Sequence, residues 1–322
     1  MSDGSRSVTD IEGMQVDPDR SIDFPGQIDL VIDRLRVARE DWRTAHPAHA
    51  EQGAQFPSRQ ALKRITRELG TALFPLRLGP AEITASNENA FVAASLEPLL
   101  AQLQAQIDIE LRYAAPETAD GEAIAATSER LIGSVAANLP ALRRLLDRDV
   151  EAAYASDPAA RSVDEVLAAY PSLTAVIHHR LAHLLHRLGV PLVARIIAEL
   201  AHDQTGIDIH PAAQIGQGFF IDHGTGVVIG ETAVLGDRVR LYQGVTLGGD
   251  PDLFDAPPGT PRHPIVGDDV VIFANAAIVG RVAIGARSRI GGNVWLRNDV
   301  QPDTLVEAPL PIFRPIGDRQ GA

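Results

Sequence analysis

The stretch Ile229-Gly-Glu-Thr-Ala-Val-Leu-Gly-Asp-Arg-Val-Arg-Leu-Tyr-Gln-Gly-Val-Thr-Leu247 repeats an aliphatic residue every six positions. Its anchors are Ile229, Leu235, Leu241 and Leu247, and each of the first three is followed four positions later by a small or β-branched residue. An amphipathic helix repeats every 3.6 residues and a half-buried strand every two, so neither explains the pattern. A six-residue period is typical of a parallel β-helix, in which three hexapeptides close one coil.

The period extends beyond this stretch in both directions, after a slip of two residues between Val227 and Ile229. The outlying anchors are all aliphatic: Ile209, Ile215, Ile221, Val227, Val266, Ile272, Ile278, Ile284, Ile290 and Leu296. Stacked coils would bury them in one continuous core. Between Gly249 and His263 the proline-rich segment 250–262 cannot follow a coil, so we expect it to leave the helix as a loop.

The remaining chain divides by composition. Residues 1–26 are polar and acidic and predict a disordered tail, whereas residues 27–204 show apolar spacings of three and four and predict about seven to nine helices. Prolines such as Pro140 and Pro171 are expected at helix ends. The predicted fold class is α+β, with an N-terminal all-α domain followed by a left-handed parallel β-helix over 205–311 and a tail over 312–322.

The amino-acid composition excludes several classes of partner and of catalytic group. The 322 residues include 42 acidic and 29 basic side chains, a formal net charge of -13, which argues against a nucleic-acid or anionic-membrane surface. The absence of cysteine excludes disulfides, thiolate nucleophiles and cysteine-ligated zinc. No secretory leader or membrane-spanning run stands out, so a cytoplasmic protein with a small-molecule partner is expected.

The residues best suited to chemistry are His223, in Ile221-Asp-His-Gly-Thr-Gly226, and Asp208, fifteen positions upstream. Residues about one coil of eighteen apart become neighbours on adjacent coils, so the carboxylate could orient the imidazole as a general base. The alternative is that His223 caps a turn while Asp208 bonds to backbone. Spacing alone leaves both open.

Five motifs resemble those of the bacterial serine O-acetyltransferases, a hexapeptide-repeat acyltransferase family: Gly206-Ile-Asp-Ile-His-Pro211, Ile221-Asp-His-Gly-Thr-Gly226, Val228-Ile-Gly-Glu-Thr-Ala-Val234, Gln243-Gly-Val-Thr-Leu-Gly-Gly249 and Arg262-His-Pro264. The resemblance covers about half of the chain, from Asp157 to Pro311. It implies transfer of an acetyl group from acetyl-CoA to the hydroxyl of L-serine, the first step of cysteine biosynthesis.

The resemblance also implies roles for individual residues. His223 would be the general base and Asp208 its orienting partner. The ammonium group of serine would meet Asp157 and Asp222. Its carboxylate would meet Arg262, with His263 beside it. A zwitterion is well served by anions near its ammonium group and a guanidinium near its carboxylate.

By the same resemblance, small residues line the pantetheine groove of acetyl-CoA, namely Gly248, Gly249 and Ala274, and no metal is needed. A homo-oligomer is expected because coil ends are exposed, and feedback inhibition by L-cysteine is a further expectation. Relatives that bind cysteine synthase do so through a C-terminal isoleucine, whereas this sequence ends Asp318-Arg-Gln-Gly-Ala322, so that complex is not predicted.

Two alternatives remain at this stage. The acceptor of an acetyl-CoA-dependent enzyme could instead be homoserine or a sugar, although a sugar would leave Asp157, Asp222 and Arg262 without a charged partner. A gamma-type carbonic anhydrase shares the β-helix but binds zinc through three histidines, and the spacing of His210, His223 and His263 does not match that arrangement.

Overall fold

The computed structural model describes residues 23, 25–46, 56–115, 118–253, 255–257 and 259–309, and the chain divides into two compact units, Met1–Gly53 and Ala54–Ala322. The described part of the first unit is the helix α1 (Ile28–Ala45), which buries none of its residues. Most of the predicted tail 1–26 and the whole predicted tail 312–322 lie outside the described residues. The C-terminal sequence behind the expectation about cysteine synthase therefore lies outside them too.

The helical part of the second unit contributes to two apolar clusters. Its described helices are α2 (Arg59–Leu73), α3 (Pro75–Leu78), α4 (Glu88–Ala114), α5 (Gly121–Ser156), α6 (Val163–Ala169), α7 (Pro171–Arg187) and α8 (Pro191–Thr205). One cluster lies among the helices, and Leu62, Leu103 and Ile197 are fully or almost fully buried in it. The other joins the second half of α5, α6 and the start of α7 to the core of the strands. Pro171 begins α7 as expected, but Pro140 lies inside α5. The exposed ring forgoes one backbone hydrogen bond there, while buried leucines on either side hold the helix together.

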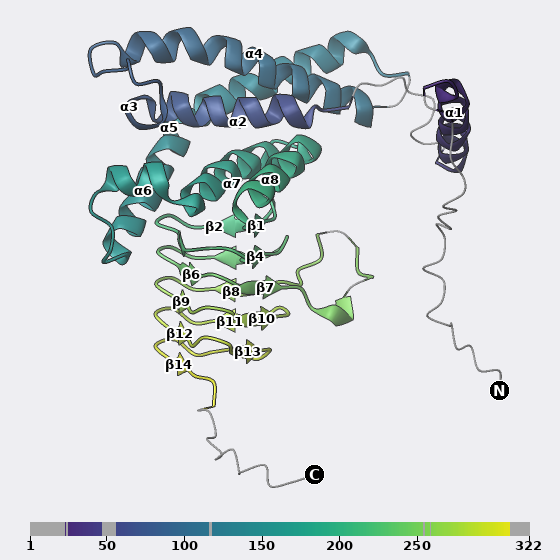
Figure 1. Cartoon of the computed structure of the whole chain (residues 1–322). Helices are drawn as coiled ribbons and strands as arrows, with labels where there is room; N and C mark the ends of the chain where they lie inside the picture. The colour runs from purple at the N-terminus through teal and green to yellow at the C-terminus, as the bar shows by residue number, and fades with distance from the viewer. Residues whose placement is uncertain are drawn as a thin grey trace, which may run out of the picture. The chain divides into compact units, whose positions relative to one another are not determined.

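Short parallel strands follow the helices and stack into a β-solenoid of about five turns (Figure 1). The first sheet contains β1 (Asp208–Ile209), β4 (Val228–Ile229), β7 (Thr246–Gly248), β10 (Ala277–Val279) and β13 (Trp295–Leu296). The second contains β2 (Gln214–Ile215), β5 (Val234–Leu235), β8 (Ile265–Val266) and β11 (Ala283–Ile284). The third contains β3 (Phe220–Asp222), β6 (Arg240–Tyr242), β9 (Val271–Ile272), β12 (Arg289–Ile290) and β14 (Leu305–Val306).

Strand register reproduces the six-residue period and its interruptions. Val228 pairs with Thr246, one coil of eighteen residues away, whereas Asp208 pairs with Val228 across twenty, because the two-residue slip lies between them. Thr246 pairs with Ala277 across 31 residues, thirteen more than a regular coil. The extra residues form the loop, which contains the short 3-10 helix η2 (Pro251–Leu253) and closes where Asp250 N–H donates to the Arg262 carbonyl at 2.9 Å.

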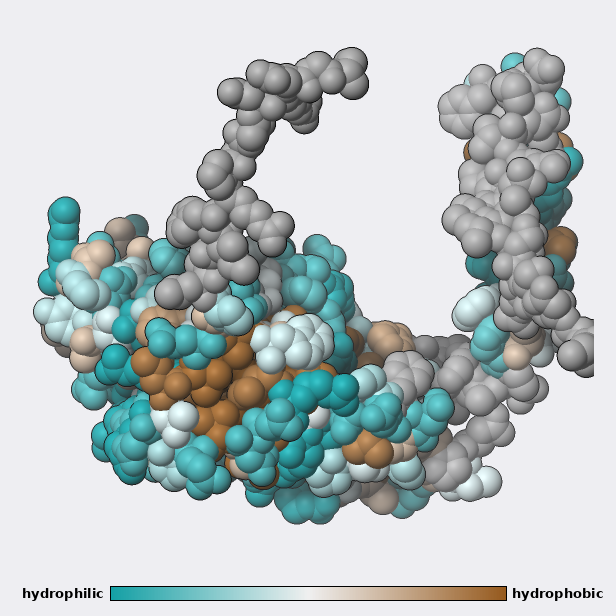
Figure 2. Space-filling model, turned by 90° about the horizontal axis from the view of Figure 1, so that it is seen from below, coloured by the Kyte–Doolittle hydropathy of each residue, from teal (hydrophilic) through white to brown (hydrophobic). Residues whose placement is uncertain are grey.

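The aliphatic anchors point into the coil and form its core. Twelve of the fourteen predicted anchors are buried, while Ile215 and Leu296 are partly buried against the same cluster. The predicted fold class, an all-α region followed by a left-handed parallel β-helix, is confirmed. At the end of the stack away from the helices, apolar side chains gather on the surface (Figure 2).

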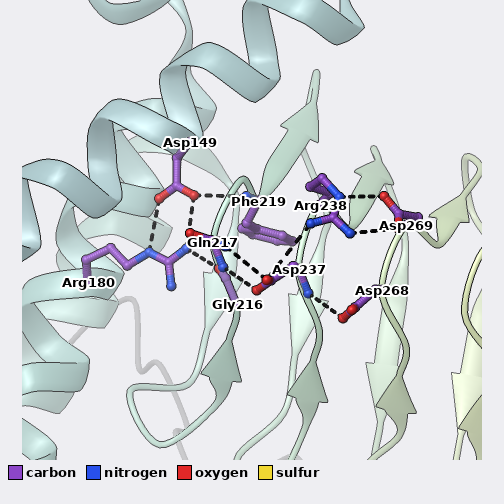
Figure 3. Close-up of polar contacts among 9 residues, drawn as sticks. All are labelled: Asp149, Arg180, Gly216, Gln217, Phe219, Asp237, Arg238, Asp268 and Asp269. Carbon is purple, nitrogen blue, oxygen red and sulfur yellow. Dashed lines mark hydrogen bonds and ion pairs between the residues drawn. The ribbon is translucent and has the colours of Figure 1, made fainter.

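A buried ion pair joins the helices to the first coil (Figure 3). Asp149 of α5 and Arg180 of α7 are 0% and 5% exposed and share two hydrogen bonds of 3.0 and 3.1 Å. Arg180 also donates to the carbonyls of Ile215 and Gly216, and Asp149 accepts from Phe219 N–H. Removing one partner of such a buried pair lowers the stability of the fold by about 3 to 5 kcal/mol. This network therefore fixes where α5 ends relative to β3.

Candidate active site

His223 stands in the two-residue insertion that interrupts the repeat. Five residues join β3 to β4 at the corner between the third and first sheets, whereas three residues join β6 to β7 directly below. The insertion pushes His223 off the regular corner, with its side chain 75% exposed and its φ at 61°. Six other described non-glycine residues, such as Asn275 and Asp303, have a φ of 56 to 60° at corners of the coil, so it is the exposure of the side chain that shows the imidazole to face outward.

Asp208 begins the strand beside this corner. Its backbone N–H donates to the carbonyl of Val227, so Asp208 and the His223 turn lie on adjacent coils at one edge of the first sheet. Between the described side chains of Asp208 and His223 no hydrogen bond or ion pair is formed. The imidazole instead lies next to Asp222, with His223 Nε2 3.8 Å from Asp222 Oδ1.

Asp157, at the end of α5, joins Asp222 and His223 at the same corner. Tyr170 donates a 2.5 Å hydrogen bond to Asp157 Oδ2, and Ala159 N–H donates to Oδ1. These bonds hold the pKa of Asp157 below its usual value and raise the pKa of Tyr170 to about 12, since the phenol keeps its proton for the carboxylate. Asp157 is therefore an ionised carboxylate at neutral pH.

Arg262 and His263 lie at the other edge of the first sheet, where the loop rejoins the coil before β8. Arg262 Nη2 is 2.7 Å from Glu231 Oε2. His263 Nδ1 accepts from Thr232 N–H at 3.1 Å, and the ring is 6% exposed. Burial, followed by the charge of Arg262, lowers the pKa of His263 and favours its neutral form.

Gly230 makes room for His263. A Cβ atom at position 230 would stand 1.9 Å from His263 Cδ2, so only glycine allows the ring to pack there. Arg281 supports the same corner from the coil below, donating to the carbonyls of Thr232 and His263 at 2.8 and 3.0 Å. Packing and hydrogen bonds therefore hold this edge of the sheet in place, and it is not a loop end in solvent.

The predicted site residues therefore divide between two corners. His223, Asp222 and Asp157 lie where the third sheet meets the first, and Arg262 and His263 lie where the first meets the second. The face between these corners spans about five extended residues, on the order of 15 Å. The acetyl-CoA candidates divide likewise: Ala274 follows β9 at the first corner, while Gly248 and Gly249 end β7 at the second.

Comparison with known proteins places the chain in a family. The chain is 45% identical over 287 residues to the plasmid serine acetyltransferase of Synechococcus elongatus, covering 87% of this chain and 90% of that protein. The chain belongs to the serine acetyltransferase family. No family model matches it.

Solved serine acetyltransferases share the fold. Isoform 3 from Entamoeba histolytica, in complex with cysteine, is 34% identical with a TM-score of 0.67, covering 78% of this chain and 83% of that one. A serine acetyltransferase in complex with CoA is 27% identical with a TM-score of 0.50, covering 76% and 96%. The family resemblance inferred from the motifs is confirmed.

Several residues at this serine acetyltransferase site were not singled out from the sequence. Tyr170 and Thr232 act on Asp157, His263 and Arg262 through contacts across 13 to 31 residues of chain, which no short motif reports. The same holds for Arg240, whose Nη2 lies 2.6 Å from Asp222 Oδ2. The sequence offered one signal for this contact, because the basic Arg240 follows the acidic Asp222 by about one coil.

Two absences apply to the described ranges. No group of three or more histidine and carboxylate side chains there is placed to hold a metal ion. No helix in those ranges has the length and apolar character needed to cross a membrane.

Proposed function

We propose that this chain transfers the acetyl group of acetyl-CoA to the hydroxyl of L-serine, giving O-acetylserine and CoA as the first step of cysteine biosynthesis. The observation that carries the proposal is the outward His223 flanked by two carboxylates, in a chain 45% identical over most of its length to a serine acetyltransferase. Membership of the family supports the reaction class. The His223 corner supplies a base and two carboxylates, and the Arg262 corner supplies a cation.

His223 acts as the general base. Its imidazole removes the proton of the serine hydroxyl as that oxygen bonds to the thioester carbon. The tetrahedral intermediate then releases CoA, and the imidazolium returns the proton to the departing sulfur. Asp208 orients the ring: because the imidazole is exposed, a rotation about its side-chain bonds can bring a ring nitrogen toward Asp208 on the adjacent coil.

Asp157 and Asp222 receive the ammonium group of serine, and Arg262 receives its carboxylate. Asp157 is suited to this because its lowered pKa keeps it charged. Arg262 is already oriented by Glu231, and its fork can form paired hydrogen bonds with a second carboxylate. His263 lies next to Arg262 and adds a neutral hydrogen-bonding group.

A single chain cannot place these groups around one serine. The ammonium and carboxylate groups of an amino acid are attached to one carbon, whereas Asp222 and Arg262 stand at corners on the order of 15 Å apart. A ring of copies related by rotation would place the His223 corner of one chain against the Arg262 corner of the next. The proposed site is therefore shared between two copies, and the expected homo-oligomer is required for activity.

The same interface accommodates acetyl-CoA. Ala274 lies two coils below His223 at one corner, and Gly249 lies beside His263 at the other, directly after Gly248. Small residues on both walls leave backbone open to a pantetheine chain. Since L-cysteine has the charges of serine and a related protein binds it, cysteine is expected to inhibit by competing at the acceptor site.

An acceptor screen tests the proposed reaction. Thiol release from acetyl-CoA is measured with L-serine, homoserine, threonine and simple sugars, using the His223→Asn variant as the blank. Serine is expected to give the highest kcat/KM: a sugar lacks the charges that the carboxylates and Arg262 would bind, and homoserine and threonine share those charges but carry a hydroxyl that is one carbon farther away or crowded by a methyl group. A sugar or homoserine acting while serine gives no release would contradict the substrate assignment.

A further inference from the structure

Arg240 occupies a central position at the His223 corner. It lies on the outer face of β6, in register with Phe220 of β3. Its guanidinium is 4.7 Å from the ring centroid of Tyr242 and 5.4 Å from that of Phe220, both within cation-π range. With the side chain 20% exposed, the guanidinium is held between two aromatic rings rather than free in solvent.

The guanidinium has one charged hydrogen-bond partner at this corner. Arg240 Nη2 donates to Asp222 Oδ2 at 2.6 Å, whereas Asp222 Oδ1 faces His223. Arg240 Nε is buried without a hydrogen-bond partner among the described residues. A buried donor without a hydrogen bond is unfavourable for folding, so the position is not optimised for stability alone. Residues kept at such a cost are expected where function requires them.

We infer that Arg240 is a positioning residue for the acceptor site: it fixes Asp222 and offsets part of its charge, so that one carboxylate oxygen stays available to the ammonium group of serine. The inference rests on the proposed function. It adds a residue that neither the motifs nor the family resemblance assigned. Arg240 itself acts through Asp222.

The electrostatic consequence has a definite sign. The charged and titratable groups around His223 are Asp222 on β3, Asp157 at the end of α5, Asp208 on β1, Arg240 on β6 and, through Asp157, Tyr170. Removing the cation leaves the carboxylates unopposed, which favours the imidazolium form. A base must be unprotonated to act, so the acid limb of kcat/KM moves to higher pH.

The test compares Arg240→Met with Arg289→Met. Arg289 lies in the same outer column of the third sheet, two coils away, and is exposed. Arg240→Met is expected to raise the KM for serine about tenfold, to change the KM for acetyl-CoA less than twofold, and to move the acid limb upward by on the order of half a pH unit. Arg289→Met is expected to match wild type.

A cycle with Asp222→Asn separates positioning from a structural role. In that background, Arg240→Met should shift the acid limb clearly less than in wild type, because the carboxylate that Arg240 contacts directly is gone while Asp157 and Asp208 remain. Arg240→Lys should keep the acid limb near that of wild type even if Arg240→Met does not fold. Equal changes in both KM values without a pH shift, or Arg240 variants indistinguishable from Arg289→Met, would overturn the inference. Absence of serine activity in wild type would instead refute the proposed function.

Discussion

Replacing His223 by asparagine is expected to lower kcat by two to four orders of magnitude, the usual contribution of a general base. Asparagine retains a polar side chain and tolerates positive φ better than most residues, so the turn at φ 61° should keep its shape. The measurement is steady-state thiol release from acetyl-CoA at saturating serine.

The melting temperature separates catalysis from folding in this experiment. Because His223 is 75% exposed, the variant should melt within a few degrees of wild type. His202→Asn, an exposed histidine on α8, provides the matched control and should retain full activity. If His223→Asn kept more than about a tenth of wild-type kcat, the imidazole would not be the base.

Replacing Arg262 by alanine is expected to raise the KM for serine by about 10- to 100-fold. A hydrogen bond to a charged group contributes about 1.5 to 3 kcal/mol, and each 1.4 kcal/mol is tenfold in affinity. The KM for acetyl-CoA should change little, because the thioester does not carry the carboxylate that Arg262 binds. Initial rates with each substrate varied in turn give the two constants.

The lysine variant distinguishes geometry from charge at this position. Arg262→Lys retains the positive charge but not the planar fork, so its KM for serine should lie between those of wild type and Arg262→Ala. If Arg262→Ala raised both KM values equally, Arg262 would not be the group that recognises the serine carboxylate.

The fold was predictable because its core follows a strict period. Aliphatic anchors such as Leu241 and Ile272 recur every six residues and are fully buried. The slip between Val227 and Ile229 was also visible, but its consequence was not: it inserts two residues at one corner and pushes His223 outward. Proline placement was less reliable, since buried leucines override the local effect of Pro140 in α5.

The candidate site was only partly predictable. Motifs identified His223, Asp222 and Arg262. They did not show that Arg262 lies at a different corner, because sequence order alone does not tell which sheet precedes each residue. Glu231 contacts Arg262 because the chain leaves the coil after β7 as a loop and returns with Arg262 at the corner that holds Glu231. The bond between Asp222 and Arg240 depends on register, which pairs residues twenty apart in this coil.

The claim that the site is shared between copies can be tested by combining two defective subunits. Chains carrying His223→Asn and Arg262→Ala are co-expressed with different affinity tags, and mixed oligomers are isolated through both tags. Each interface that joins an intact His223 on one chain to an intact Arg262 on the next should be active. Because the two tags remove rings of a single type, random assembly of a closed ring leaves about a quarter to a third of the interfaces intact, the larger share for a trimer.

The assay uses a serine concentration well below the KM, at which the Arg262→Ala parent is slow because its KM for serine is raised. Under those conditions the mixed oligomers should show about a quarter to a third of wild-type kcat/KM, far above either parent. Activity of the mixed oligomers no higher than the average of the two parents would contradict a site built from the corners of neighbouring chains.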